Sequence, residues 1–380
     1  MDDKPAPRDI SGVDLASTAP FEDLPTPAVL IDLDVVEKNI GAMQERARRA
    51  GVKLRPHAKT HKSPEIARMQ LSAGASGLTL AKTSEAEVFA SLGFDDIFLA
   101  YPIFGADKAR RLLAVADRVR LRVGVDSVAG ARSLADVFHA AGRRLPVLLK
   151  IDCGYHRVGV APEAALETAR RIAELPGITF AGLFTHGGQG YAARTPEEAA
   201  RAASVEGEAV SAAAAAVAAG GLPVGEVSLG STPTVRASMT TGGVTECRPG
   251  TYVYNDFSQV SLGTARLADC AMTVLATVVS VPARDRAVVD AGSKTLSTDP
   301  LRPAADGHGL VLGRQSRIAR LSEEHGVISV AEGESFRVGE RVRILPNHAC
   351  VVSNLHDRLV AIRAGRVAGP VTVAARGCVQ

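Results

Sequence analysis

The sequence has 380 residues, of which 46% are hydrophobic and 22% charged, and its 44 Lys and Arg against 41 Asp and Glu give a formal net charge of +3. That balance is too even for an electrostatic nucleic-acid binder, and the composition is too apolar for a disordered chain. Five cysteines are too few for a disulfide scaffold. The sequence lacks a signal-peptide pattern and any run of about 18 apolar residues, so we expect a cytoplasmic protein that binds neither nucleic acid nor membrane.

Between residues 25 and 262, short runs of β-type composition alternate with helical stretches. The first run, residues 28–34, precedes a stretch over 35–50 in which Val36, Ile40 and Met43 recur at helical spacing. Eight more runs follow, over 53–59, 77–81, 96–100, 119–125, 145–152, 179–186, 226–230 and 245–253. This alternation predicts a TIM-type (β/α)8 barrel. A doubly wound sheet is the alternative, but no Gly-x-Gly-x-x-Gly motif follows the first run.

After residue 262 the pattern changes to short β-rich runs separated by Gly, Pro and Asp. These runs lie over 271–281, 286–291, 326–330, 341–345, 349–353 and 359–362. Long helical periodicity is absent, so we expect a mostly β C-terminal domain over 263–380 after a barrel domain over 25–262. Residues 1–24 are then an N-terminal extension.

The ends of the predicted barrel strands carry most of the residues that could do chemistry, as expected for this fold. Four such segments are rich in His, Arg, Lys or Tyr: RPHAKTHK (55–62), DCGYHR (152–157), THGGQGY (185–191) and RPGTYVY (248–254). A fifth, the Gly-Ser-Thr-Pro-Thr turn over 230–234, has backbone amides and hydroxyls that could hold a phosphate.

A buried lysine at a strand end together with a phosphate turn suggests a pyridoxal 5′-phosphate site. Lys59 would form an imine with the cofactor, and the nearby basic groups Arg55, His57, His61 and Lys62 would lower its pKa. The residues alone leave open whether RPHAKTHK is such a site or a solvated basic turn.

A second candidate site is the His-x-Cys pair formed by His348 and Cys350. On an extended segment both side chains would point to one face, and imidazole with thiolate suits Zn²⁺ or a similar metal. Two protein ligands are too few for a closed structural site and would leave positions for water or a substrate hydroxyl. The alternative is a buried cysteine beside a histidine in a turn. If the His-x-Cys pair were the only observation, this alternative would be preferred.

Seven segments, taken together, resemble one known family. They run in order from about residue 24 to 357: LPTPAVLIDLD, RPHAKTHK, DCGYHRVGV, FTHGGQGY, LGSTPT, RPGTYVYND and PNHACVVSNLHD. They look like the fold-type III pyridoxal-phosphate enzymes that include D-threonine aldolase and D-serine dehydratase, with alanine racemase as a distant relative. RPHAKTHK together with PNHAC is the most specific part. The resemblance implies a (β/α)8 barrel followed by a β-domain, with run 28–34 pairing in the β-domain.

The resemblance also assigns roles to individual residues. Lys59 would be the Schiff-base lysine, Arg157 would lie near the cofactor's phenolic oxygen, and His186 beside its pyridine ring. Tyr191 resembles an active-site tyrosine of the D-serine dehydratases, and Arg248 lies where alanine racemase has the arginine that binds the pyridine nitrogen. The residues that would bind the phosphate are Gly230, Ser231, Thr232, Gly250 and Thr251.

For the reaction, the resemblance implies a divalent metal (Mn, Mg or Zn) on His348 and Cys350 that binds the β-hydroxyl of a D-3-hydroxy-amino acid. NHACVVSNLHD resembles the aldolase branch, which predicts retro-aldol cleavage to glycine and an aldehyde. His61 or a metal-bound water is the candidate base. The alternative is dehydration of D-serine or D-3-hydroxyaspartate to a 2-oxo acid and ammonia, in which Lys59 removes the α-proton.

Three further readings are less favoured. An amino-acid racemase would not need the His-x-Cys pair. A pyridoxal-phosphate homeostasis protein would have no β-domain, and a sugar-phosphate barrel enzyme would explain the phosphate turn but not RPHAKTHK. Because members of the family generally pair two chains, we also expect a homodimer.

Overall fold

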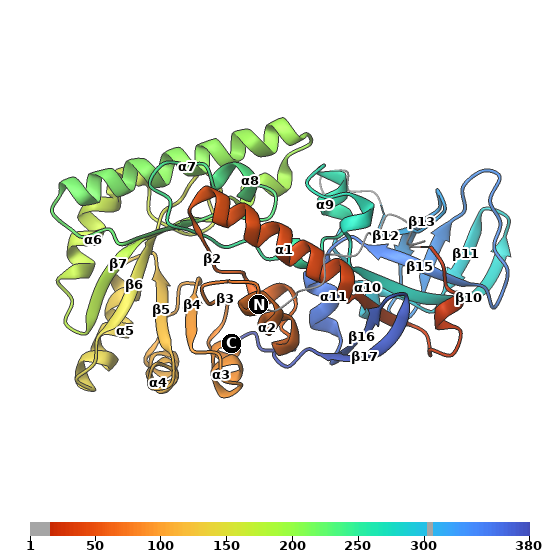
Figure 1. The fold of residues 1–380 in the computed structure, drawn as a ribbon, viewed down its shortest axis with the longest axis horizontal. Coiled ribbons are helices and arrows are strands. Elements are labelled where there is room, and N and C mark those ends of the chain that lie inside the picture. Colours follow the sequence, from red (N-terminus) through yellow and green to blue (C-terminus); the bar gives the residue numbers. More distant parts are fainter. Residues whose placement is uncertain (1–15, 302–306) are drawn as a thin grey trace, which may run out of the picture. The chain divides into compact units, whose positions relative to one another are not determined.

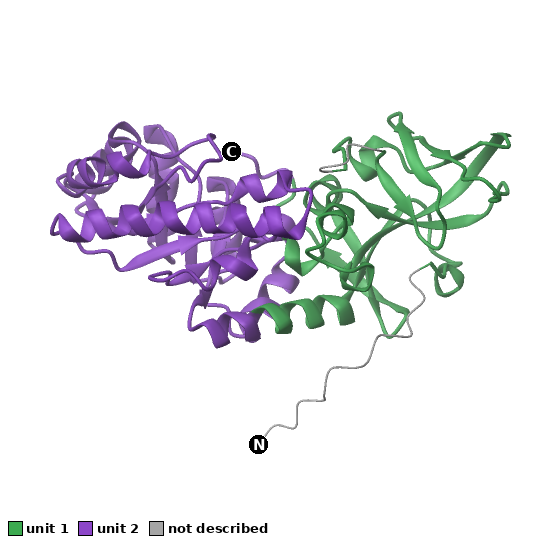
Figure 2. Ribbon diagram, turned by 90° about the horizontal axis from the view of Figure 1, so that it is seen from above, with its two compact units in different colours: residues 1–43, 251–376 green, residues 44–250, 377–380 purple. Residues whose placement is uncertain are grey.

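The computed structural model describes residues 16–301 and 307–380, so the predicted N-terminal extension is described only from residue 16. The chain divides into two compact units (Figure 2). One comprises residues 44–250 with 377–380, and the other comprises residues 1–43 with 251–376. We refer to them as the barrel unit and the β-unit.

The barrel unit contains an eight-stranded parallel sheet (Figure 1). Its strands, in spatial order, are β2 (Lys53–Leu54), β9 (Glu246–Cys247), β8 (Glu226–Leu229), β7 (Ile178–Phe184), β6 (Leu145–Lys150), β5 (Arg120–Val125), β4 (Asp96–Leu99) and β3 (Leu78–Leu80). A parallel bridge between His57 and Thr79 joins the two ends of this order, and the Thr79 amide donates to the Pro56 carbonyl at 2.8 Å. The predicted TIM-type barrel is confirmed.

Helices alternate with these strands and lie outside them (Figure 1). They are α2 (Pro64–Ser72), α3 (Thr83–Ser91), α4 (Ala106–Ala116), α5 (Val128–Ala140), α6 (Ala165–Ala173), α7 (Pro196–Ala219) and α8 (Val235–Ser238), with α1 (Leu33–Ala50) running from the β-unit into the barrel unit. Ser63, Ser127 and Thr195 cap the first turns of α2, α5 and α7, each accepting an amide hydrogen from the residue three positions later. The polar caps therefore set where these helices begin.

Among the described residues, α7 is the helix that could cross a membrane by length and composition alone. Its buried residues include Ala203, Val210 and Val217, which recur at helical spacing. Its buried Glu206 accepts a hydrogen bond from Thr185, which follows β7, at 2.8 Å. These contacts explain the apolar composition of α7 as that of a helix packed on the barrel.

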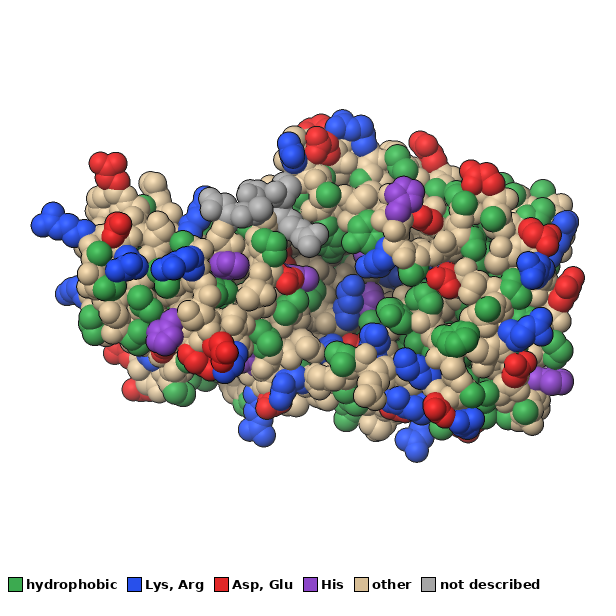
Figure 3. All heavy atoms as spheres, turned by 180° about the vertical axis from the view of Figure 1, so that it is seen from behind, with side chains coloured by type: hydrophobic (Ala, Val, Ile, Leu, Met, Phe, Trp, Pro, Cys, Tyr) green, Lys and Arg blue, Asp and Glu red, His purple; other side chains and the backbone are tan. Residues whose placement is uncertain are grey.

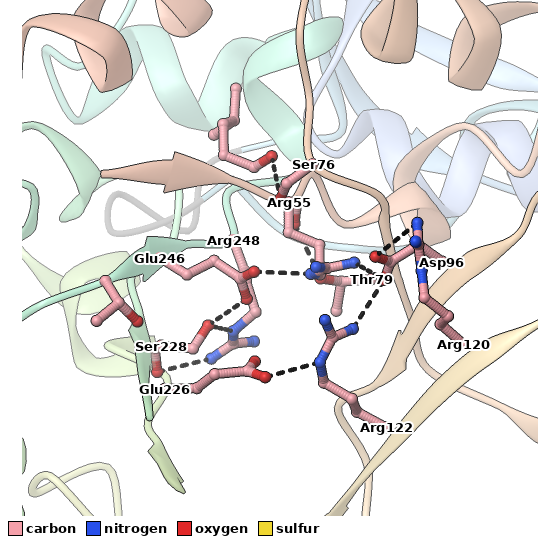
Figure 4. A network of polar contacts seen from close by, with 12 residues as sticks. Arg55, Ser76, Thr79, Asp96, Arg120, Arg122, Glu226, Ser228, Glu246 and Arg248 are labelled. Carbon is pink, nitrogen blue, oxygen red and sulfur yellow. Dashed lines mark hydrogen bonds and ion pairs between the residues drawn. The ribbon is translucent and has the colours of Figure 1, made fainter. Parts of the chain in front are cut away.

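Charged side chains inside the barrel form a connected network (Figure 4). Buried Arg55 forms ion pairs with Asp96 and with Glu246, the latter at 2.7 Å. Arg122 donates to Asp96 at 2.7 Å and to Glu226 at 2.8 Å. On the outer surface, Figure 3 shows acidic side chains lying among the basic ones.

The β-unit is built on a nine-stranded sheet. The order is β11 (Arg286–Val289), β14 (Gly326–Ser329), β13 (Arg317–Leu321), β12 (Gly309–Val311), β15 (Arg341–Pro346), β10 (Met272–Ala283), β1 (Ala28–Asp32), β16 (Arg358–Arg363) and β17 (Arg366–Thr372), with a further β11–β10 pairing. Strand β1 pairs antiparallel with β10 and parallel with β16. Leu30, Leu275 and Ile362 form part of the core that this pairing buries. The mostly β second part of the predicted fold is confirmed.

Short helices complete the β-unit: α9 (Phe257–Ser261), α10 (Ser293–Leu296) and α11 (Ala349–Leu355), with 3₁₀ turns at Ala19–Phe21 (η1), Thr251–Val253 (η5) and Leu267–Asp269 (η6). The strand predicted over 349–353 is wrong, because those residues form most of α11. His348 precedes this helix in an extended conformation, and the Asp256 carboxylate accepts the Ala349 amide hydrogen at 3.1 Å. A capped amide therefore outweighs the β-preference of Val351 and Val352.

The division between the units differs from the boundary predicted at residues 262–263. The structure divides at Gly250–Thr251, because residues 251–262 bond to the β-unit. The Ser258 hydroxyl donates to the Asn347 carbonyl at 2.8 Å, and the Ala271 amide donates to Tyr254 at 2.7 Å. At the other end, the last residues belong to the barrel unit, where the Ser84 amide donates to Gln380 at 3.0 Å.

Candidate active site

Lys59 lies on a single 3₁₀ turn, η2 (Ala58–Thr60), that begins at His57. The His57 ring accepts the backbone amide of Lys59 at 3.4 Å, while the Lys59 side chain is exposed. The sequence predicted a buried lysine with Arg55 beside it. Instead, Arg55 forms ion pairs with Asp96 and Glu246 inside the barrel, and Lys59 is exposed.

His61, the candidate base, is fully buried two residues further on. Its Nδ1 accepts the Ser63 amide hydrogen at 3.0 Å, and burial lowers the pKa of its ring to about 4. Ser63 in turn caps α2. These contacts tie the Lys59 turn to α2, and the role of His61 as a base stays a prediction.

Positive charges gather around His186, which follows β7. Loss of surrounding water, followed by the charges of Lys59, Lys150 and Arg157, lowers the pKa of His186 well below its usual value, so its ring is neutral. Arg157 is exposed and lies over the Tyr155 ring at 4.9 Å, and the Tyr155 and His186 rings meet edge to face at 6.0 Å. The barrel unit thus brings the predicted Lys59 and Arg157 within electrostatic reach of His186.

Lys150 was not predicted as a site residue. It is buried at the end of β6, and its amine lies over the Phe184 ring at 4.7 Å. Burial, and then the charges of Arg248 and Arg157, lower the pKa of Lys150 to about 7. Its place at the carboxyl end of a barrel strand was the signal that could have found it.

Arg248 is buried in the same part of the barrel unit. Its Nε donates to the Ser228 hydroxyl at 2.8 Å, and Ser228 donates to Glu246 at 2.8 Å (Figure 4). Its guanidinium also donates to the Thr185 carbonyl and lies 5.3 Å from the Phe184 ring centre. Bonds to neighbouring strands therefore fix the direction of this side chain.

The Gly-Ser-Thr-Pro-Thr turn follows β8 and is buried. Gly230 has φ +95°, which favours glycine, and its amide donates to Glu206 at 3.0 Å. The Ser231 amide donates to the Thr234 hydroxyl at 3.0 Å, and the Ser231 hydroxyl donates to Gly187 at 2.9 Å. The Gly230 and Ser231 amides therefore have partners within the protein, and their role in binding phosphate stays a prediction.

The remaining predicted cofactor residues lie in three places. Thr232 is buried in the turn, and Tyr191 is half-buried in the 3₁₀ turn η4 (Gly188–Ala192). Gly250 packs against the Lys59 turn so closely that a Cβ atom would lie 2.8 Å from the Thr60 hydroxyl. Thr251 belongs to the β-unit, where its hydroxyl lies 3.5 Å from the Cys350 sulfur.

The donor set in the barrel unit fits pyridoxal phosphate. An exposed amine, the neutral imidazole of His186 and the cations Lys150, Arg157 and Arg248 suit an anionic aromatic aldehyde. Gly250 leaves room for close approach to the Lys59 turn, where a side chain would collide. The donor set therefore has the charge that the cofactor needs.

The His-x-Cys pair lies in the β-unit. His348 and Cys350 flank the start of α11, and both are partly exposed. The Nδ1 of His348 lies 2.6 Å from the Asp299 carboxylate, a residue that the sequence analysis missed. Within residues 16–301 and 307–380 no three His, Cys, Asp or Glu side chains form a complete metal site. An imidazole, a thiolate and a carboxylate on the far side of the imidazole nonetheless fit an open divalent-metal site.

Comparisons with known proteins agree with this architecture. The family described as alanine racemase, N-terminal domain, matches residues 31–257, and a serine dehydratase domain matches residues 271–362. D-threo-3-hydroxyaspartate dehydratase from Delftia sp. (strain HT23) is 38% identical, with 86% of this chain and 91% of that protein covered.

Solved structures extend the likeness to the fold. D-threonine aldolase from Filomicrobium marinum has a TM-score of 0.87 at 33% identity, covering 94% of this chain and 97% of that one. An alanine-for-cysteine variant of D-threo-3-hydroxyaspartate dehydratase, described as metal-free, has a TM-score of 0.86 at 35% identity, covering 92% and 98%. In another solved variant of that enzyme, alanine replaces a histidine two positions earlier. The chain therefore belongs to the alanine racemase-like, fold-type III pyridoxal-phosphate lyases that include D-threonine aldolase and the D-serine and D-3-hydroxyaspartate dehydratases.

Proposed function

We propose that this lyase acts on D-3-hydroxy-amino acids and removes water from them, giving a 2-oxo acid and ammonia. The observation that carries the proposal is the exposed amine of Lys59 on a fixed turn, beside a neutral His186. Such an amine can take the proton from the substrate's Cα, as elimination of a β-hydroxyl requires.

The cofactor is proposed to lie in the barrel unit. When bound, pyridoxal phosphate supplies an electron sink for negative charge at the substrate's Cα. Lys59 would hold it through its amine, and Arg157 would donate to its phenolic oxygen. Its phosphate would lie at the turn that contains Gly230, Ser231 and Thr232, with Gly250 and Thr251 as further candidate contacts. Tyr191, five residues after His186, is a further candidate for contact with the cofactor.

His186 and Arg248 would determine the electronic surroundings of the cofactor's ring. A neutral imidazole can lie beside the ring without adding another positive charge. Arg248 is always protonated at physiological pH, and its bonds to Ser228 and Thr185 would orient it towards the ring nitrogen.

We further propose that His348 and Cys350 hold a divalent metal, of which Zn²⁺ suits the thiolate best, with Mn²⁺ and Mg²⁺ as the other candidates. Such an ion would act as a Lewis acid on the substrate's β-hydroxyl. Two solved variants of D-threo-3-hydroxyaspartate dehydratase, one described as metal-free, replace a histidine and a cysteine that have the spacing of His348 and Cys350. This match is one reason to place dehydration first.

Retro-aldol cleavage to glycine and an aldehyde is the second candidate. The likeness to D-threonine aldolase and the segment NHACVVSNLHD support it. It requires a base at the substrate's hydroxyl; because His61 is buried and bonded to Ser63, we propose a metal-bound water as that base. We also expect a homodimer and a cytoplasmic location, where the Cys350 thiol stays reduced. Light scattering of the purified protein would test the dimer.

The test supplies the purified holoenzyme with D-threo-3-hydroxyaspartate, D-serine and D-threonine, with and without EDTA. Oxaloacetate from the first or pyruvate from the second supports dehydration. Glycine with acetaldehyde from D-threonine would transfer the assignment to the aldolase. Failure to turn over all three would refute the proposal.

Two variants test the parts of the site separately. Lys59→Ala should lose the absorbance of the bound cofactor and all turnover, whereas Lys53→Ala, at an exposed lysine of β2, should keep both. Cys350→Ala should keep the cofactor absorbance and lose EDTA-sensitive turnover. Insensitivity of the unmodified enzyme to EDTA would refute the metal.

A further inference from the structure

The side chain of Asp299 contacts His348, the histidine of the proposed metal-binding pair. Its Oδ2 lies 2.6 Å from the Nδ1 of His348, in a segment 49 residues earlier in the chain. The two side chains are 45% and 37% exposed, so the contact is at the surface of the β-unit and is open to a ligand from solvent. An exposed ion pair of this kind contributes little to stability by itself, which makes a stabilising role alone a weak explanation.

The main chain of Asp299 is held at the same place. The Asn347 amide group donates to the Asp299 carbonyl at 3.0 Å and to the Gly307 carbonyl at 2.9 Å. The Asp299 amide itself donates to the Ser297 hydroxyl at 3.2 Å. Consecutive residues, Asn347 and His348, thus bind the backbone and the side chain of one aspartate, so the direction of its carboxylate is fixed.

The contact determines which nitrogen of His348 can bind a metal. With Nδ1–H donated to the carboxylate, Nε2 carries the lone pair. Histidines that bind metals commonly donate their other ring nitrogen to a carboxylate, which orients the ring and raises its basicity. Because Asp299 contacts Nδ1, it lies behind an imidazole that binds a metal through Nε2.

A second aspartate, Asp256, contacts the backbone of the same segment and not the imidazole ring. Asp256 is buried, and its carboxylate accepts the amides of Ala349 at 3.1 Å and Gln259 at 3.0 Å. It therefore fixes the backbone at the start of α11, whereas Asp299 fixes the imidazole ring.

We propose that Asp299 is a positioning residue for the metal site: it sets the tautomer and orientation of His348 and thereby raises the affinity for a divalent metal without binding the metal. The inference rests on the proposed metal role of His348 and Cys350. Loss of such a carboxylate typically lowers metal affinity by roughly 10- to 100-fold.

The experiment titrates Co²⁺ into metal-stripped, full-length protein that carries its cofactor. Absorption from charge transfer between the Cys350 thiolate and cobalt reports binding without reference to turnover. We expect Asp299→Ala to weaken Co²⁺ binding by about 10- to 100-fold. Asp299→Asn should lie between Asp299→Ala and the unmodified protein, because its amide oxygen can still accept from Nδ1 without the charge. Asp285→Asn, at an exposed aspartate of the same unit, should bind as the unmodified protein does.

The outcomes separate this inference from the proposal on which it rests. Equal Co²⁺ affinity in Asp299→Ala and the unmodified protein would overturn the positioning role and leave the metal pair standing. Absence of the thiolate band in the unmodified protein would refute the metal pair itself. Unchanged circular dichroism and cofactor absorbance in each variant exclude misfolding as the cause.

Discussion

Glu206 offers the sharpest test of how the phosphate turn is held. This fully buried carboxylate on α7 accepts four hydrogen bonds: from the Thr185 hydroxyl at 2.8 Å, the Gly230 amide at 3.0 Å, the Thr234 hydroxyl at 3.1 Å and the Ser238 hydroxyl at 3.3 Å. Three of these donors lie in or directly after the Gly-Ser-Thr-Pro-Thr turn. Glu206 therefore connects the turn to α7 and to the end of β7.

The cost of its removal follows from those four bonds. Replacing Glu206 by alanine leaves the Gly230 amide buried without an acceptor, at about 1–3 kcal/mol, and opens a space where the side chain was. The hydroxyls can turn to other acceptors and cost less. We expect a total loss of about 3–5 kcal/mol in the free energy of unfolding.

Glu206→Gln should cost only about 1–2 kcal/mol. Its amide oxygen can accept from Thr185 and Gly230, while the hydroxyls of Thr234 and Ser238 can turn to accept from its NH₂ group. The matched control is Glu208→Ala, an exposed glutamate on the same helix, which should stay within about 0.5 kcal/mol of the unmodified protein. Urea unfolding followed by circular dichroism measures all three. In addition, the cofactor should dissociate more readily from Glu206→Ala than from Glu208→Ala. Equal unfolding free energies for the two alanine variants would refute the reasoning.

Two more predictions concern buried cations of the barrel unit. Arg55→Met leaves Glu246 and Asp96 without their shared partner and should cost about 3–5 kcal/mol in urea unfolding, and a loss below about 1 kcal/mol would contradict a structural role for the network. For Lys150, whose pKa is lowered to about 7, the unfolded chain binds more protons than the native one from about pH 7 to 10, so stability should rise with pH by up to about 1.4 kcal/mol per pH unit. Lys150→Met should rise less steeply, and equal slopes in urea unfolding at pH 7 and 9 would count against the lowered pKa.

The sequence predicted the elements whose signal is periodic. Eight strand-like runs separated by helical stretches led to the barrel, and the loss of helical periodicity after residue 262 led to the β-domain, as the structure has them. The prediction over 349–353 was wrong because a contact from Asp256, nearly a hundred residues away, caps the amide that begins α11. No local pattern contains that contact.

The sequence could propose site residues where they adjoin one another in the chain. RPHAKTHK and PNHAC carried Lys59, His348 and Cys350. Glu206 and Asp299 were missed because each contacts a motif that lies far away in the chain. Their own sequence neighbours are those of an ordinary helix for Glu206 and of an ordinary turn for Asp299. Lys150 was missed because a lysine after LPVLL is typical of the end of a strand. Its lowered pKa comes from burial and from the charge of Arg248, and neither is visible in the sequence.

The placement of His61 bears on which reaction this fold can perform. Retro-aldol cleavage needs a base at the substrate's hydroxyl, and His61 and a metal-bound water were the two candidates predicted for it. The structure buries that ring completely, bonds it to Ser63 and lowers its pKa to about 4. Elimination instead needs a base at Cα, and the exposed Lys59 amine can serve as one. The same octapeptide thus provides one group suited to moving a proton and one suited to holding the turn, which leaves a metal-bound water as the remaining candidate base for retro-aldol cleavage.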